Sequence, residues 1–256
     1  MSYPSLPTDL SPTKIKSVEM QSEVREFFGW RESDDYDSAL RLISTIEDAG
    51  VHSWARHNRM VSLSKLYRRL IIREASVAIL GAAIEPAEVL SVLEEPVLFV
   101  SADGATGVFS ELPSSKSEKA WSRLACVVSD ADGGVGTLEA VKRAVPIVLH
   151  AHGHNEKDWL SLIEEARNQS EPPELILTHQ TSKSIPGMHN PGGFTDGDRA
   201  VSFLLSLGVN KERMSLLGTS TESVGRWSGF TNEETKLEKL RWMAQSLSIH
   251  GFEIDN

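Results

Sequence analysis

The spacing of hydrophobic residues changes near residue 74, and this change predicts two kinds of structure. Between Val18 and Arg73 apolar residues recur at helical intervals, as at Val24, Phe27 and Phe28. Beyond this point, short and nearly continuous apolar runs alternate with amphipathic stretches. We therefore expect helices in the first part of the chain and a sheet flanked by helices in the second.

Five apolar runs in the second part end in small or polar residues, which is typical of central strands in a parallel sheet. They are SVAILGAA, PVLFVSADGA, LACVVSDADGG, VPIVLHAHG and PELILTHQT. Helical stretches such as LEAVKRA, KDWLSLIEEARN and DGDRAVSFLLSLG lie between or after them. The pattern predicts an α/β fold with a Rossmann-like, open and mostly parallel sheet, which binds its ligands beyond the carboxyl ends of the strands.

Three segments follow from this pattern. Residues 1–16 are rich in Ser, Pro and Thr, so we expect a flexible arm. We expect residues 17–73 to form an N-terminal helical subdomain and residues 74–256 an α/β catalytic domain. The acidic run from Glu32 to Asp37 suits the first turn of a helix, and we prefer this interpretation to a metal site.

The segment from Glu233 to His250 predicts a charged amphipathic helix. Its Leu237, Leu240 and Leu247 recur at intervals that place them on the side facing the protein body.

Composition narrows the class of protein. A chain of 256 residues, 40% of them hydrophobic, is long enough for one sizeable core or two small ones. No apolar run approaches the roughly 20 residues of a membrane span, and no signal-peptide core is evident, so we expect a cytoplasmic protein. The net charge of −10 argues against a nucleic-acid partner.

The single cysteine, Cys126, lies in an apolar run and is expected to be a buried structural thiol.

Carboxylates follow two successive predicted strands. Asp103 precedes Gly104 after VLFVSA, and Asp130 and Asp132 follow LACVVS. Asp-Gly pairs are common in turns for backbone reasons alone. Two such pairs at neighbouring strand ends would instead gather charge that a hard cation compensates, so we predict Mg²⁺ binding by Asp103, Asp130 and Asp132.

The segment GGFTDGDRA predicts a helix start that suits a phosphate. Its relevant residues are Gly192, Gly193, Thr195, Asp196, Asp198 and Arg199. Thr195 is suited to cap the helix, Arg199 and free amides suit a phosphate, and either carboxylate suits a metal or the proton of a hydroxyl group. A capped helix that binds nothing is the alternative.

Histidines follow the fourth predicted strand in the sequence HAHGHN. His150 and His152 alternate and therefore share one side of an extended segment, with His154 and Asn155 after them. Hydrogen bonding to phosphate is our preferred role, with structural histidines as the alternative. Zinc is disfavoured because cysteine partners are absent.

Weaker signals come from isolated loop residues. Gly81 closes the first predicted strand like half of a glycine-rich phosphate loop. Thr178 and Gln180 close another strand and are suited to bind a base or ring amide, with exposed loop residues as the alternative. Arg226 is a candidate phosphate contact or a solvated residue.

Taken in order, ADGAT, SDADGG, HAHGHN and GGFTDGDRA resemble the archaeal 6-hydroxymethyl-7,8-dihydropterin pyrophosphokinases. The resemblance also takes in FGWRESDDYDSALRL, the strand at ILGAA, the THQT element and the C-terminal KLEKL helix. That family is similar in turn to thiamin pyrophosphokinases.

The resemblance implies an enzyme that transfers the β,γ-diphosphate of ATP to a pterin hydroxymethyl group and releases AMP, a step toward folate or methanopterin-type cofactors. It implies Mg²⁺ on Asp103, Asp130 and Asp132, metal or base work for Asp196, and phosphate binding by Arg199. A homodimer is expected from the likeness to thiamin pyrophosphokinases.

The chain departs from the family pattern at three places. Ala83, Ile84 and Glu85 stand where Gly, Pro and Ser are expected, Ala131 replaces a larger apolar residue, and His154 replaces Asp. The alternatives are a thiamin pyrophosphokinase, a nucleotide-sugar-binding transferase related to flagellin glycosylation factors, and a catalytically silent nucleotide-binding module.

Overall fold

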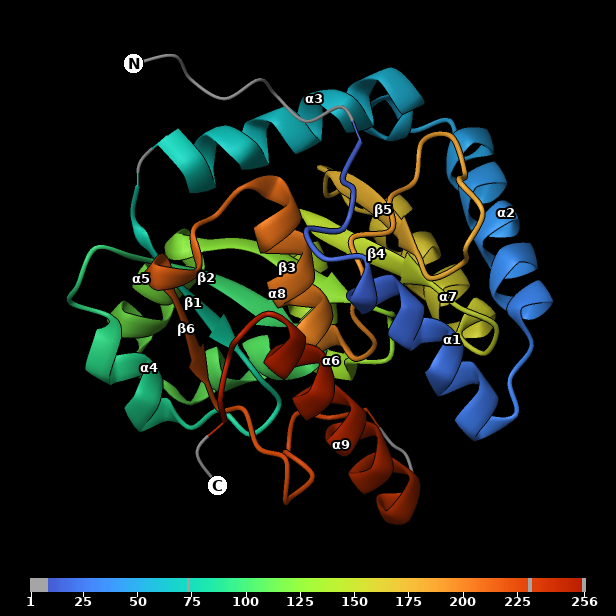
Figure 1. Ribbon diagram of the computed structural model, residues 1–256. Coiled ribbons are helices and arrows are strands. Elements are labelled where there is room, and N and C mark those ends of the chain that lie inside the picture. Colours follow the sequence, from blue (N-terminus) through green and yellow to red (C-terminus); the bar gives the residue numbers. More distant parts are fainter. Residues whose placement is uncertain (1–8, 73, 230–231, 255–256) are drawn as a thin grey trace.

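The protein has one parallel sheet of six strands, seen in a computed structural model that describes residues 9–72, 74–229 and 232–254 (Figure 1). The order across the sheet is β5-β4-β3-β2-β1-β6, and every neighbouring pair is parallel. The strands are β1 (Ser76–Leu80), β2 (Val97–Ala102), β3 (Leu124–Ser129), β4 (Ile147–Ala151), β5 (Leu175–His179) and β6 (Met214–Leu217). The predicted open α/β fold is confirmed.

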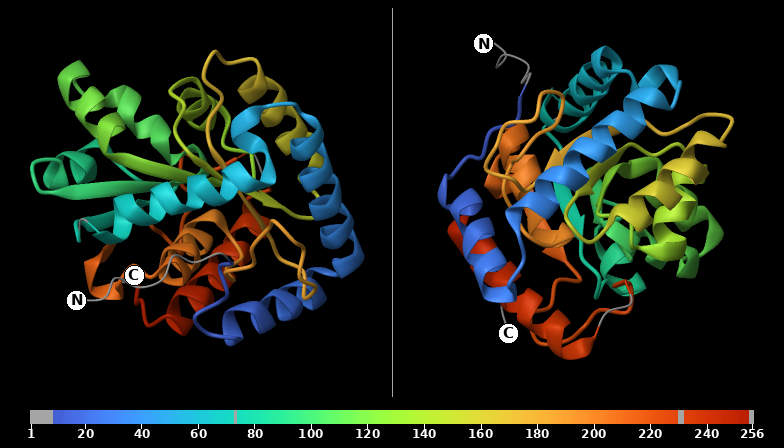
Figure 2. Two further views of the ribbon diagram at one scale, coloured as in Figure 1. Left: turned by 90° about the horizontal axis from the view of Figure 1, so that it is seen from above. Right: turned by 90° about the vertical axis from the view of Figure 1, so that its right-hand side faces the viewer.

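Helices cover both faces of the sheet (Figure 2). Strand residues alternate between the two cores, so that Leu80 packs into one and Ile79 into the other. The first core includes residues of α4 (Pro86–Val92), η3 (Asp103–Glu111), α5 (Ser114–Arg123), α6 (Gly134–Lys142) and α7 (Glu156–Arg167). The second includes residues of α3 (Arg56–Tyr67), α8 (Asp196–Leu207) and α9 (Glu233–Ile249).

The N-terminal helices lie over different parts of this body. α1 (Lys16–Phe28) contacts α9, and α2 (Glu32–Asp48) contacts α7 and β5. Short helical segments complete the description, namely η1 (His52–Trp54), η2 (Arg68–Ile72) and η4 (Lys211–Arg213). The acidic run does begin a helix at Glu32, as predicted. The division into domains stays a prediction.

The expected N-terminal arm is only partly described. Residues 1–8 lie outside the described residues, whereas Leu10 is buried in the core between the sheet and α8. At the other end, Leu240 and Leu247 of α9 are buried and Leu237 packs beside them, as predicted. Cys126 is a buried free thiol, and burial raises its pKa to about 12.

The order of the strands places a crevice between β1 and β6. The chain steps outward from β1 to β5, then returns through α8 to place β6 on the other side of β1. In open α/β sheets ligands bind where the strand order reverses, beyond the carboxyl ends. Gly81 and Gly218, which follow β1 and β6, therefore mark an expected binding position. In the described part of the chain, no helix has the length and apolar character that crossing a bilayer requires.

Candidate functional site

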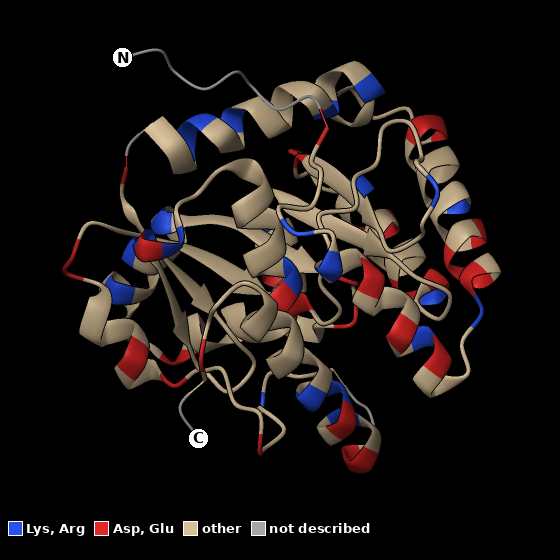
Figure 3. Ribbon diagram, in the orientation of Figure 1, with Lys and Arg blue, Asp and Glu red and all other residues tan. Residues whose placement is uncertain are grey.

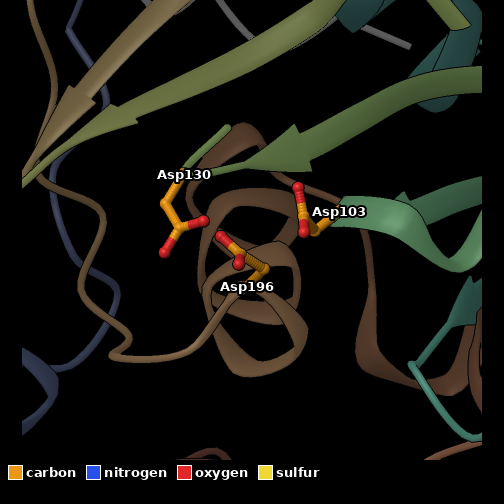
Figure 4. A group of neighbouring side chains, drawn as sticks. All are labelled: Asp103, Asp130 and Asp196. Carbon is orange, nitrogen blue, oxygen red and sulfur yellow. The ribbon is translucent and has the colours of Figure 1, made fainter. Parts of the chain in front are cut away.

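Three aspartates converge at the carboxyl ends of the central strands (Figure 4). Asp103 follows β2, Asp130 follows β3, and Asp196 is the first residue of α8. Each offers a carboxylate oxygen, and these oxygens all lie within 4.8 Å of one another. We call Asp103, Asp130 and Asp196 the acidic trio. This geometry can hold a divalent cation, because hard cations prefer carboxylate oxygens.

The charges of the trio disturb one another. Burial, followed by the charges of Asp196 and Asp130, holds the pKa of Asp103 well above its usual range. Burial and the charge of Asp130 do the same to the pKa of Asp196. Burial would also raise the pKa of Asp130, but His152 and Arg199 outweigh it and lower that pKa. The trio therefore holds more negative charge than its surroundings neutralise.

Asp103 is fixed by hydroxyl groups. Its Oδ1 accepts hydrogen bonds from Ser129, at the end of β3, and from Thr137 of α6 at 3.3 Å. Its backbone has a φ of 45°, which is uncommon for a residue other than glycine. The hydrogen bonds to Oδ1 favour one orientation of this carboxylate.

Asp132 lies beside the trio. It lines the neighbouring pocket, and its backbone amide donates to Asp130 Oδ1 at 3.4 Å. Burial and the charge of Asp130 raise its pKa. The carboxylates that lie closest together are therefore Asp103, Asp130 and Asp196. The sequence had suggested Asp132 as the third member instead of Asp196. A metal-binding role for Asp132 stays a prediction.

A pocket that is partly open to solvent extends from the trio to the β1–β6 crevice. Gly81 lies in its wall, where a Cβ atom would come within 2.5 Å of the carbonyl oxygen of Gly218. Only a residue without a side chain fits this close approach. The other lining residues are Ala82, Ala83, Ala102, Asp103, Asp132, Thr195, Asp196, Gly197, Gly218, Thr219, Ser220, Ser223, Gly225, Trp227, Ser228, Gly229, Lys236, Leu240 and Met243.

Most of the predicted site residues at the start of α8 form hydrogen bonds within that helix start. Thr195 and Asp198 form a capping box, as the capping prediction for Thr195 implied. Arg199 is buried, donates to Asp196 Oδ1 at 2.8 Å and to the carbonyl oxygen of Phe194 at 2.6 Å. Gly193 has a φ of 87° and lies against the backbone of Arg199. Of these residues, Asp196 and Thr195 line the pocket.

The histidines after β4 take three different positions. His150 is buried, with Nδ1 3.0 Å from Thr178 Oγ1 and Nε2 3.3 Å from Gln180 Oε1. Burial and the charge of Arg199 hold its pKa well below the usual range, so the ring is neutral. His152 Nε2 lies 3.3 Å from Asp130 Oδ2, and His154 is exposed.

Asn155 organises the same loop. Its amide nitrogen donates to the carbonyl oxygens of Asp130 and His150 at 2.7 and 2.8 Å, and its Oδ1 accepts from the backbone of His152. These contacts join the ends of β3 and β4. Asn155 therefore positions His152 beside Asp130.

A buried network behind the histidines was not predicted. Asp35 accepts from Gln180 at 3.0 Å and from the backbone of Gly153 at 2.8 Å, and it pairs with Arg25 at 3.4 Å. Arg25 also donates to the carbonyl oxygen of Gln180. The network ties α1 and α2 to the ends of β4 and β5. A carboxylate inside an acidic helix start gives no sequence signal of such burial.

Gly104 and Arg226 lie at the border of the pocket. A Cβ atom at Gly104 would come within 2.5 Å of the carbonyl oxygen of Gly133. The guanidinium of Arg226 pairs with Glu111 and with Glu85 and lies over the ring of Trp227 at 4.8 Å. The guanidinium of Arg226 is thus already paired with two carboxylates beside the pocket.

Two lysines of α9 face the trio; they belong to the KLEKL segment noted in the sequence, but no site role was predicted for them. Lys236 lines the pocket, and Lys239 interacts electrostatically with Asp130, Asp132 and Asp196. Figure 3 shows that α9 carries both basic and acidic residues. The spacing of these lysines relative to Leu240 and Met243 was the available signal.

The fold and site define an open α/β protein with a carboxylate centre beside a glycine-lined pocket at the reversal of strand order. Proteins of this architecture bind nucleotides or other phosphates in that position.

Comparison with known proteins gives a more specific likeness. The chain is 35% identical over 125 residues to a protein of Methanothermobacter thermautotrophicus named 6-hydroxymethyl-7,8-dihydropterin pyrophosphokinase, a match covering 46% of this chain and 45% of the relative. It is 32% identical over 155 residues to a protein of Pyrococcus furiosus with the same name, covering 58% and 59%. The matches thus span about half the length of these curated relatives. No family model matches the chain, and no solved structure matches it.

Proposed function

We propose that this protein is a diphosphokinase that transfers the β,γ-diphosphate of ATP to the hydroxymethyl oxygen of 6-hydroxymethyl-7,8-dihydropterin. The observation that carries the proposal is the acidic trio at the carboxyl ends of the strands, next to the glycine-lined pocket. The four ordered motifs and the likeness to two curated pterin pyrophosphokinases favour the pterin as acceptor. The expected homodimer and cytoplasmic location stay predictions.

The nucleotide is assigned to the pocket at the β1–β6 crevice. Close backbone approach at Gly81 and Gly218 leaves peptide groups rather than side chains facing the pocket. Such a surface suits a phosphate or a nucleoside, as in other folds that bind nucleotides at a strand reversal. The triphosphate would extend from this pocket to the acidic trio, which borders it through Asp103 and Asp196.

A magnesium ion fits the trio. Asp103 and Asp196 have raised pKa values because they are buried next to other carboxylates, and a bound cation would relieve this repulsion. Asp130 keeps its charge through the contact with His152 and the nearby Arg199. When bound, the ion would neutralise phosphate oxygens and help orient them.

In the proposed reaction the acceptor oxygen bonds to the β-phosphorus of ATP. The bond from that phosphorus to the oxygen bridging to the α-phosphorus breaks, its electron pair leaves with AMP, and the hydroxyl proton passes to a carboxylate of the site. Asp196 is our candidate for this proton, because it lines the pocket and is held by Arg199 at 2.8 Å. Positioning and charge supply most of the acceleration in such transfers.

The test is a product assay with purified protein, ATP, Mg²⁺ and 6-hydroxymethyl-7,8-dihydropterin. Thiamin and acceptor-free samples serve as controls, and mass spectrometry identifies nucleotides and pterins. We expect AMP and a pterin diphosphate in equal amounts. ADP with a pterin monophosphate would contradict diphosphate transfer. Turnover of thiamin alone would reassign the acceptor, and no turnover of either would remove the proposal and leave sugar nucleotides to be tested.

A further inference from the structure

The inward side of α9 carries two lysines among apolar residues. Lys236, Lys239, Leu240 and Met243 recur at intervals of three or four, which places them on one side of the helix. Leu240 and Met243 are buried, and both line the pocket together with Lys236. A Cβ atom at Gly197, in the first turn of α8, would lie 3.4 Å from Met243 Sδ, so α9 lies directly against the start of α8. Both lysines therefore extend toward the acidic trio.

The two ammonium groups approach the trio from different sides. Lys236 lies on the side of the β1–β6 crevice, because it lines that pocket with Asp132 and Asp196. Lys239 lies on the side of the α1–α2 turn, because its Nζ is 5.7 Å from the centre of the Trp30 ring. Trp30 is in turn close to His154, which follows β4. The trio therefore lies between Lys236, on the side of the pocket, and Lys239, on the side of Trp30.

Both lysines lack an ion-pair partner in the described part of the chain. Arg241 on the same helix differs, because it pairs with Glu238 and its side chain is 70% exposed. Burial lowers the pKa of Lys239, against the opposing effect of Asp130. Both side chains are half-buried, and withdrawing an ammonium group from water without a direct partner has a cost. A polyanionic ligand would offset this desolvation cost by pairing with both ammonium groups.

We propose that Lys236 and Lys239 are phosphate-contacting catalytic residues. Lys236 contacts the α-phosphate that leaves with AMP, and Lys239 contacts the diphosphate as it moves to the acceptor. This assignment rests on the proposed function. Lys236 offsets the charge of the α-phosphate oxygens, which is present in bound ATP as well as in the transition state, so it acts mainly on nucleotide binding. Lys239 offsets charge on the non-bridging oxygens of the transferred group, and Trp30 positions it by a cation–π contact.

The alternative is that both lysines only offset the charge of the trio within the free protein. This alternative and the proposal differ in their kinetic consequences. Charge compensation alone would change stability and metal affinity. Contact with phosphates changes nucleotide binding or the rate of transfer, and a group acting mainly in the transition state lowers kcat more than it raises KM.

The experiment compares Lys236→Met and Lys239→Met with Arg241→Met, which removes a paired and exposed cation from the same helix. We expect Lys236→Met to raise KM for ATP about tenfold with little change in kcat. We expect Lys239→Met to lower kcat roughly 100-fold with little change in KM for ATP. Arg241→Met should stay within about twofold of the parent protein. The variants Lys236→Arg and Lys239→Arg, which keep the charge, check for folding defects.

A second measurement separates this inference from the proposed function. Calorimetry with Mg²⁺ and α,β-methylene-ATP, which lacks the cleavable bridging oxygen, reports nucleotide binding without a pterin. If the pterin is not a substrate but Lys236→Met weakens analogue binding about tenfold, the assignment of Lys236 stands and the acceptor is wrong. If the parent protein makes pterin diphosphate and both Met variants match Arg241→Met, the lysine proposal is wrong and the proposed function stands.

Discussion

The carboxylate of Asp198 accepts two hydrogen bonds from Thr195, one from the backbone amide at 2.7 Å and one from the hydroxyl at 2.6 Å. Its other oxygen accepts from the backbone amide of Phe194 at 2.7 Å. Asp198 is fully buried, while Asp196 faces the pocket from the same helical turn. Two aspartates that look alike in the sequence therefore have different surroundings.

Asp198→Asn should destabilise the protein more than it impairs catalysis. The amide nitrogen would face donor groups, leaving a buried donor unpaired, so the unfolding free energy should fall by about 1–3 kcal/mol. Asp196→Asn should leave stability within about 1 kcal/mol of the parent and lower kcat at least about 100-fold. Urea denaturation and product assays on both variants check this. Equal kcat losses without a stability difference would restore a chemical role for Asp198.

Asp103→Asn should stabilise the metal-free protein at neutral and alkaline pH. The folded-state pKa of Asp103 is raised, so the folded state binds a proton more strongly than the unfolded state. Stability is therefore lost as pH rises from the unfolded pKa through the folded pKa. The variant avoids this loss, and we expect a gain of about 1–2 kcal/mol at pH 8 in EDTA.

Millimolar Mg²⁺ should reverse this order, because a cation that binds the folded parent stabilises it and has fewer ligands in the variant. Thermal unfolding from pH 5 to pH 8, with and without Mg²⁺, checks both parts. A parent protein whose stability rises over this pH range without metal would contradict the prediction.

Asp35→Ala should destabilise the protein strongly. It leaves Arg25 buried without its ion pair and removes the acceptor for Gln180 and Gly153, and the expected cost is about 3–5 kcal/mol. Asp34→Ala is a matched control on the same helical turn, because Asp34 pairs with the exposed Arg31. It should cost less than about 1 kcal/mol. Urea denaturation of both variants measures the difference, and similar costs would show that the network is not stabilising.

Gly193→Ala should displace the start of α8. Its φ is 87°, and a Cβ atom would lie 2.6 Å from Arg199 Cα. Gly29→Ala is the control, since Gly29 has a φ of 70° but open space around the added atom. We expect about 1 kcal/mol for Gly29→Ala and at least about 3 kcal/mol with loss of activity for Gly193→Ala. Circular dichroism melts and the product assay compare them.

Local sequence pattern was sufficient for most of the fold. The five long apolar runs became β1 to β5, because strands buried on both sides must be apolar throughout. The edge strand β6 was missed, since Met214–Leu217 is short and only partly buried. Its pairing with β1 depends on the whole crossover, which local periodicity does not encode.

The site was predicted as far as strand ends and helix starts could indicate it. Asp103 and Asp130 lie together because parallel strands end at one edge, and Asp196 joins them because α8 begins there. Lys236, Lys239 and Asp35 reach the site only because α9 packs against α8 and α2 packs against β4 and β5. Local spacing shows on which side of a helix a residue lies, as for Lys236 and Lys239 beside Leu240, but not what that side packs against.

The pairing of β6 with β1 also bears on the order in which the protein matures. Gly81 leaves the ribosome early, but Gly218 and the lysines of α9 follow more than half the chain later. Until they arrive, β1 is an unprotected sheet edge and the crevice has a single wall. The proposed nucleotide pocket therefore gains its second wall only after Gly218 and the lysines of α9 have been synthesised.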